Sequence, residues 1–181
     1  MKRLLFFFCA LLMGGCTLPL QPTGLEIQPA KVPLYHIRLS RWSEPRFSGL
    51  LALRPGQDGF SYALLDATGV TLLSARVSGS GRHQLRKAYG PFEESSLPGL
   101  LSQALFRILV AQPAELPCSR RFLLRFCYEM HEGAWRKKAS LGLATMWQVE
   151  YDRKEWQEAR YASPWTGFGL ALQTLPEGRG E

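Results

Sequence analysis

The run Tyr35-His36-Ile37-Arg38-Leu39-Ser40 carries the strongest fold signal, because apolar and polar side chains alternate along it residue by residue. A period of two is typical of a β-strand with one buried and one solvated face. Similar runs recur at 47–53, 60–65, 70–77, 82–89, 121–128, 135–140, 143–151, 156–161 and 168–172. Because short turns, many with glycine, separate these runs, they predict consecutive antiparallel strands, a meander.

One segment has a different period. Its apolar residues fall at helical spacing: Leu97, Leu100, Leu101, Ala104, Leu105, Ile108 and Leu109. Ser96 suits the N-cap, Pro98 the first turn, and Pro113 stops the helix. This pattern predicts an amphipathic helix over 97–109 that packs on the sheet. A lid or plug over a cavity is the alternative interpretation.

The chain is therefore expected to be mainly β (α+β), with an antiparallel sheet curled into a half-open barrel and one main helix covering it. Residues 34–175 form the domain, and 176–181 form a tail. If the apolar face is larger than one helix can cover, the remainder is either a solid core or a cavity for acyl chains. The candidate cavity residues are Leu51, Leu53, Leu73, Phe122, Leu124, Phe126, Leu143, Trp147 and Val149.

The amino terminus has the pattern of an export signal. Residues 1–3 are Met-Lys-Arg, and Leu4 to Met13 form a short apolar run. Such a run is too short to span a bilayer but suits a signal peptide, here residues 1–15. The sequence Met13-Gly14-Gly15-Cys16 resembles the lipobox of bacterial lipoproteins. That resemblance implies a diacylglyceryl thioether and an N-acyl group such as palmitate on Cys16. A plain secretory peptide is the alternative.

The residue after Cys16 is Thr17, whereas lipoproteins that are retained in the inner membrane have aspartate at this position. The expected location is therefore the outer membrane, lipid-anchored and facing the periplasm. Segment 16–33 contains four prolines and is expected to be an extended tether. The net charge of +7 falls by two when Lys2 and Arg3 are removed. The remaining arginines are dispersed, which disfavours a nucleic-acid partner.

No catalytic motif is recognisable. Gly79-Ser80-Gly81 completes neither a nucleophile elbow nor a dinucleotide loop. The histidines stand singly, so neither a metal site nor a cofactor is expected. Cys118 and Cys127 suit a disulfide in an oxidising compartment, but a straight strand over 121–128 would hold them too far apart. The strand is the preferred interpretation, the disulfide is the alternative, and a zinc site with His131 is weaker still.

The order of elements resembles the outer-membrane lipoprotein receptor family LolB. The resemblance rests on the lipobox, the tether, segment 47–53 (FSGLLAL) and the hairpin 62–73 (YALLDATGVTLL). It implies a half-open barrel with a hydrophobic cavity, which accepts lipoproteins from a periplasmic carrier. Thr68 stands where that family has an exposed leucine that helps to insert cargo, so a different lipid-linked product is expected here.

The sequence leaves two further hypotheses open. The chain could be a structural or assembly lipoprotein that binds another envelope protein through an open strand edge. It could also be a periplasmic hydrolase whose residues assemble only in the folded chain. The first expectation is a carrier or receptor that binds acyl chains without catalysis.

Overall fold

The computed structural model describes residues 33–93, 95–152 and 157–175. The expected signal peptide 1–15, the lipidation site Cys16, all but the last residue of the expected tether 16–33 and the expected tail 176–181 lie outside these ranges. Within the described ranges, no helix combines the length and the hydropathy that a membrane crossing requires.

Eleven strands form a single antiparallel sheet in the described part of the chain. The first five are β1 (Leu34–Arg41), β2 (Glu44–Gly56), β3 (Gly59–Leu65), β4 (Thr71–Val77) and β5 (His83–Ala88). The other six are β6 (Cys118–Arg121), β7 (Leu124–His131), β8 (Ala134–Leu141), β9 (Ala144–Tyr151), β10 (Glu158–Ser163) and β11 (Phe168–Thr174). The expectation of a mainly β protein with consecutive antiparallel strands is confirmed.

The sheet consists of two meanders joined in the middle. Its strand order is β5-β4-β3-β2-β1-β11-β10-β9-β8-β7-β6, so the first and last strands of the domain are neighbours. Ile37 lies opposite Leu172, and Leu39 lies opposite Leu170. Both pairs are buried, so the apolar residues of β1 and β11 lie on the same face of the sheet, the one that faces the core. The edge strands β5 and β6 do not pair with each other, and the sheet is not closed.

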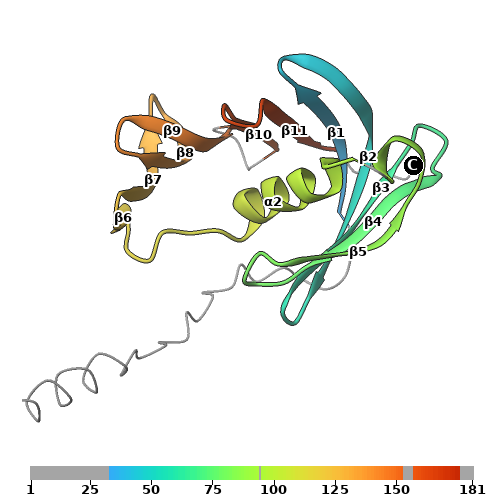
Figure 1. The fold of residues 1–181 in the computed structure, drawn as a ribbon, viewed down its shortest axis with the longest axis horizontal. Helices are drawn as coiled ribbons and strands as arrows, with labels where there is room; N and C mark the ends of the chain where they lie inside the picture. Colours follow the sequence, from blue (N-terminus) through green and yellow to red (C-terminus); the bar gives the residue numbers. More distant parts are fainter. Residues whose placement is uncertain (1–32, 94, 153–156, 176–181) are drawn as a thin grey trace, which may run out of the picture.

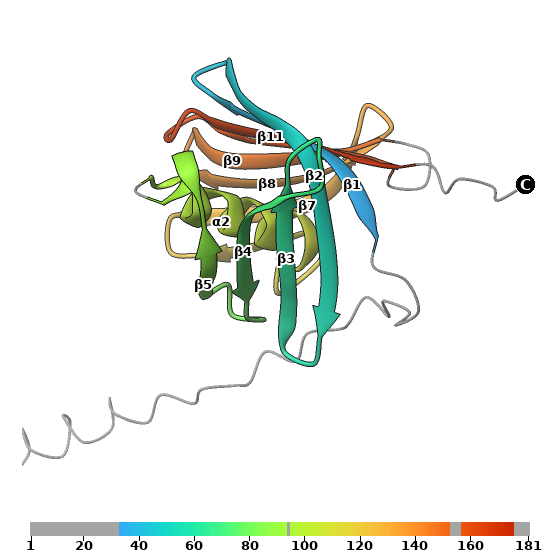
Figure 2. The ribbon, with the colours of Figure 1, turned by 90° about the vertical axis from the view of Figure 1, so that its right-hand side faces the viewer.

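The helix α2 (Leu97–Leu109) covers the concave side of this sheet, as the spacing of its leucines predicts. It lies between the arm formed by β3–β5 and the arm formed by β8–β10 (Figures 1 and 2). A short 3-10 helix, η1 (Gly90–Phe92), precedes it and buries Phe92. Leu101, Ala104 and Leu105 at the centre of the apolar stripe are inaccessible to solvent, whereas Leu97, Leu100 and Leu109 are partly buried.

The expectation of one straight strand over 121–128 is wrong. The chain turns at Phe122 and Leu123, where Phe122 has a φ of 56°, and it separates β6 from β7. In this hairpin Cys118 lies directly opposite Cys127, and the two form a disulfide with their Cα atoms 4.0 Å apart. The alternative that the sequence left open is therefore the observed one, because a turn brings together residues that a strand would separate.

Candidate functional site

The concave face beneath α2 is the candidate site. It brings together five of the predicted cavity residues: Leu51, Leu53, Leu73, Trp147 and Val149. All five are buried, and they belong to the same hydrophobic core as the inner face of the helix. In this conformation they are therefore residues of a core that includes the helix, rather than walls of an open cavity.

The other four predicted cavity residues lie elsewhere. Phe126 is half-buried and packs edge-on against Trp147, with 5.1 Å between the ring centroids. Phe122, Leu124 and Leu143 are exposed, so their prediction as cavity residues is wrong. Phe122 and Leu143 occupy turns, and Leu124 begins its strand directly beside one. These residues were assigned to strands because apolar residues in a two-residue turn continue the apolar–polar alternation of the strands on either side.

Polar contacts attach the first turns of α2 to strand β3. The hydroxyl groups of Tyr62 and Ser102 are hydrogen-bonded at 2.8 Å, and the Tyr62 hydroxyl also donates to the carbonyl oxygen of Pro98 at 3.4 Å. Both side chains are buried. Desolvation raises the pKa of Tyr62 to about 12, so the hydroxyl remains neutral and able to donate.

A second group of contacts holds the last turn of α2. The Lys137 ammonium donates to the carbonyl oxygens of Ile108 at 2.9 Å and Arg107 at 3.4 Å. The Tyr151 hydroxyl donates to the same Ile108 oxygen at 2.6 Å. The final carbonyls of a helix lack partners within the helix and carry its negative dipole end, so a cation and a hydroxyl complement them.

The environment of Lys137 is aromatic as well as buried. Its side chain is 2% exposed, and its nitrogen lies 5.5 Å from the ring centroids of both Tyr128 and Tyr151. Desolvation lowers the pKa of Lys137 to about 8, while burial raises those of the two tyrosines. At neutral pH this cluster therefore holds one cation over two neutral phenols.

Arg107 extends the cluster from the helix side. Its guanidinium stacks 5.0 Å from the ring of Trp147 and donates a hydrogen bond to the Tyr161 hydroxyl. Sequence reasoning missed Arg107, Lys137 and the tyrosines. A usable signal existed, because Lys137 and Ala139 share one face of their strand, and a lysine at an inward register position is unusual.

The outer face of the sheet carries a shallow groove of about 680 Å³. It crosses β1, β2, β10 and β11, with a floor of small residues that includes Ala162, Gly169 and Ala171. Arg46 and Arg160 border it, and each pairs with a glutamate two residues away in sequence. No residue of α2 lines this groove, so it is separate from the candidate site.

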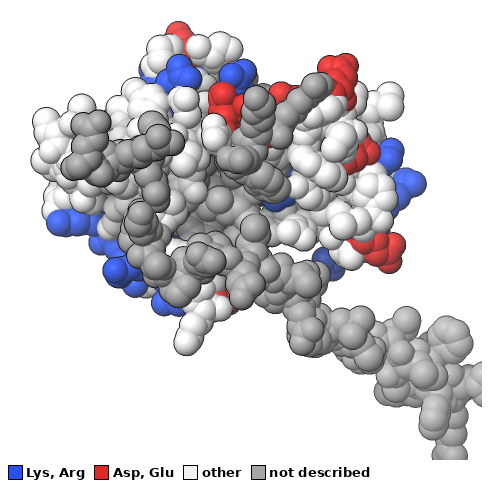
Figure 3. Space-filling model, turned by 180° about the vertical axis from the view of Figure 1, so that it is seen from behind, with Lys and Arg blue, Asp and Glu red and all other residues white. Residues whose placement is uncertain are grey.

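Other cations lie on the side of the sheet formed by β3–β5. Lys and Arg gather on the left in Figure 3, the view from behind, which is the side of these strands in Figure 1. Exposed cations there include Arg76, Arg86 and Lys87. Arg76 lies on β4, and Arg86 and Lys87 are neighbours on β5. Exposed cations of this kind are typical of a solvated strand face.

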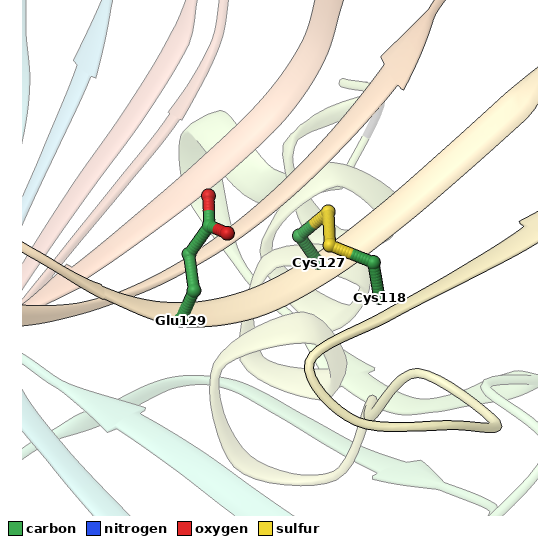
Figure 4. A group of neighbouring side chains, drawn as sticks. All are labelled: Cys118, Cys127 and Glu129. Atoms are coloured by element: carbon green, nitrogen blue, oxygen red, sulfur yellow. A yellow bond between two sulfur atoms is a disulfide. The ribbon is translucent and has the colours of Figure 1, made fainter.

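The disulfide removes the metal-binding alternative that involved its cysteines. Cys118, Cys127 and Glu129 form a close group, with candidate ligand atoms within 4.8 Å of one another (Figure 4). Both sulfur atoms are covalently bonded to each other, whereas a zinc site requires thiolates. His131 lies beside Glu132, with 3.7 Å between nitrogen and oxygen.

No protein-family model matches the sequence, and no curated protein matches it either. The properties of the concave face therefore have to follow from its own residues. They provide an extensive apolar surface that a single helix covers, with polar contacts concentrated at the two ends of that helix. A hydrocarbon ligand would reach this surface only if α2 moved.

Proposed function

We propose that the chain is an outer-membrane lipoprotein, anchored through Cys16, whose sheet acts as a half-open barrel for an acyl chain. It would accept a lipoprotein or another lipid-linked product from a periplasmic carrier. The anchor is supported by the lipobox-like sequence alone. The acyl site is supported by the concave face, where side chains from both meanders converge on one apolar surface.

A single observation carries the proposal: α2 is attached like a lid, by polar contacts near its ends and by apolar packing between them. Tyr62 holds the first turns, while Lys137 and Tyr151 hold the last turn. Apolar packing is not directional, so an acyl chain could replace the middle of the helix on the same surface. The closed structure would then be the ligand-free state, and binding would require displacement of α2.

The alternative of an assembly factor that binds through a strand edge has less support. The edge strand β5 presents His83, Arg86 and Lys87 to solvent. The opposite edge, β6, has four residues and is held by the disulfide. Charged residues and short length are the features by which natural sheets protect their edges from pairing with another chain.

The test is saturable binding of a fluorescent fatty acid, combined with hydrogen–deuterium exchange of the full chain. We expect binding that unlabelled palmitate displaces, together with faster exchange in residues 97–109 and unchanged exchange in β1 and β2. Absence of saturable binding, or binding that leaves exchange in the helix unchanged, would contradict the proposal.

Tyr62→Phe provides a variant with a defined direction. Loss of the hydroxyl should destabilise the closed state by about 1 kcal/mol relative to the open state, so the open state becomes more populated. Because apparent affinity scales with the competent fraction, fatty-acid binding should tighten by up to about fivefold. Ser48→Ala is the matched control, because it removes an exposed hydroxyl that is bonded to His36 away from the helix.

A further inference from the structure

Five turns lie at the same end of the strands, and four of them, all except the β3–β4 turn (66–70), form what we call the apolar rim. The four are the β1–β2 turn (42–43), the β6–β7 turn (122–123), the β8–β9 turn (142–143) and the β10–β11 turn (164–167). In an antiparallel meander, alternate turns fall at the same end of the sheet. Figure 2 shows the β1–β2 and β10–β11 turns projecting on the same side.

Hydrogen bonds connect these turns to their neighbours. The amide of Trp42 donates to the carbonyl oxygen of Gly167 at 2.7 Å, which joins the β1–β2 and β10–β11 turns. The indole of Trp165 donates to a carbonyl oxygen at the start of β9 at 3.0 Å. The amide of Gly142 donates to the carbonyl oxygen of Leu123 at 3.4 Å. The rim is therefore continuous rather than four separate loops.

The side chains at these turns and their flanks are large, apolar and exposed. They are Trp42, Phe122, Leu123, Leu141, Leu143 and Trp165. Phe122 is 89% exposed, and Leu143 is fully exposed. Single exposed apolar residues are common on protein surfaces, but a contiguous row of them marks an interaction site.

Two aromatic residues of the rim have a strained backbone conformation. Phe122 has a φ of 56° and Trp42 a φ of 53°, in the left-handed region that bulky residues avoid. The neighbouring β8–β9 turn places Gly142 at a φ of 57°. Glycine would relieve the strain at position 122 as it does at 142, so stability of the fold does not account for the phenyl ring.

Charge distinguishes the rim from the β7–β8 turn at the other end of the sheet. The arginines beside the rim turns are Arg41, Arg46, Arg120, Arg121 and Arg125. Within residues 40–46, 120–125, 140–145 and 163–168, Glu44 is the single acid, and Arg46 neutralises it at 2.6 Å. At the opposite end, the β7–β8 turn contains Glu132, and Glu129 lies near the end of β7. Positive charge therefore accompanies the exposed apolar row, whereas the β7–β8 turn at the opposite end is acidic.

We infer that the apolar rim docks on an anionic lipid surface. Tryptophan, phenylalanine and leucine would enter the boundary between headgroups and acyl chains, and the arginines would pair with headgroup phosphates. A row of projecting turn tips fits a planar surface, whereas a protein partner more often requires a patch with a packed centre. This inference is independent of the acyl site under α2, because it uses none of the residues of the concave face.

The test uses the full chain with Cys16→Ser, so that no acyl group is attached, and measures hydrogen–deuterium exchange on lipid vesicles. One set contains equal amounts of phosphatidylcholine and phosphatidylglycerol, and the other contains phosphatidylcholine alone. On the anionic vesicles we expect slower exchange in peptides that cover 120–125, 140–145 and 163–168. The β7–β8 turn should be unchanged.

Phe122→Ser combined with Leu143→Ser removes the two most exposed side chains. Since each apolar side chain contributes substantially to partitioning, vesicle binding through the rim should fall about tenfold or more, and the protection of the turns should disappear. The matched control combines Leu85→Ser with Met130→Ser, which removes exposed apolar residues outside the rim and should keep the protection. Circular dichroism melts check that both variants remain folded.

Three results would overturn the inference. The same protection in the Phe122/Leu143 variant would mean that another segment, such as the apolar amino terminus, holds the chain on the vesicle. Equal protection on vesicles of phosphatidylcholine alone would rule out the choice of an anionic surface. Protection on neither vesicle would reject a lipid surface and leave the rim to a protein partner.

Discussion

The Lys137 ammonium lies 2.9 Å from the carbonyl oxygen of Ile108, so a lysine of strand β8 caps the last turn of α2. This contact joins the second meander to the helix, while Tyr62 joins the first meander to the same helix. The helix is thereby held by both halves of the sheet. Its position depends on polar groups that are far apart in the sequence and almost entirely buried.

The first prediction concerns pH. Folding lowers the pKa of Lys137 from 10.5 to about 8, so the unfolded chain binds this proton more tightly. Between these two values the free energy of unfolding should therefore rise with pH, because the cost of burying the cation is relieved. Relative to Lys137→Met, the wild type should gain about 2 kcal/mol between roughly pH 7 and pH 9.5.

Denaturant unfolding of both proteins across this range measures the difference. Comparison with Lys137→Met cancels most of the contribution of groups that both chains share, including Tyr128 and Tyr151. A difference that stays constant with pH would show that the lysine is neutral throughout or accessible to solvent.

The second prediction compares two glycines in turns. Gly167 and Gly142 have nearly equal φ values of 61° and 57°. A Cβ at Gly167 would come within 2.3 Å of the Trp42 ring, whereas nothing lies within 4 Å at Gly142. Gly142→Ala should lower the free energy of unfolding by about 1 kcal/mol, because alanine disfavours the left-handed backbone conformation. Gly167→Ala should lower the free energy of unfolding by about 1–3 kcal/mol more than Gly142→Ala, because the indole of Trp42 must move.

Thermal unfolding followed by circular dichroism measures both variants. Tryptophan fluorescence should also change in Gly167→Ala and stay the same in Gly142→Ala, because only the first substitution reaches a ring. Equal destabilisation of the two variants would mean that Trp42 does not pack on Gly167.

The third prediction concerns the disulfide. Replacing Cys118 and Cys127 together by serine should lower the free energy of unfolding by about 2–3 kcal/mol, because the bridge closes a short loop in the unfolded chain. Exchange should rise first in β6, which has one neighbouring strand. Alkylation of the peptides that contain these cysteines, with and without reductant, determines whether they are paired. Full labelling without reductant would contradict the bridge.

The fourth prediction concerns the anchor. Cys16→Ala should release the protein from the membrane fraction into the periplasmic fraction, because the expected acyl chains supply the permanent attachment. The apolar rim alone should give reversible, salt-sensitive binding. Metabolic labelling with palmitate should mark the wild type and not the variant. Retention of unlabelled Cys16→Ala at high salt would contradict a lipid anchor at this residue.

Local patterns predicted the strands and the helix well. The alternation at Tyr35–Ser40 and the leucine spacing at 97–109 correspond to β1 and α2. Both signals arise from backbone geometry, which repeats every two residues in a strand and every 3.6 in a helix. The error at 121–128 arose because Phe122 and Leu123, in a turn, resemble strand residues in composition.

Local sequence therefore determined which segments are strands, which segment is the helix and which face of each is apolar. The pairing of β1 with β11, the capping of α2 by Lys137, the disulfide and the alignment of four apolar turns depended on the tertiary structure. The reason is physical: hydrophobic period is a property of neighbouring residues, whereas register between distant strands is decided by the packing of the whole sheet. Leu143 and Leu73 are equally apolar in sequence, yet one is exposed at a turn and the other is buried under the helix.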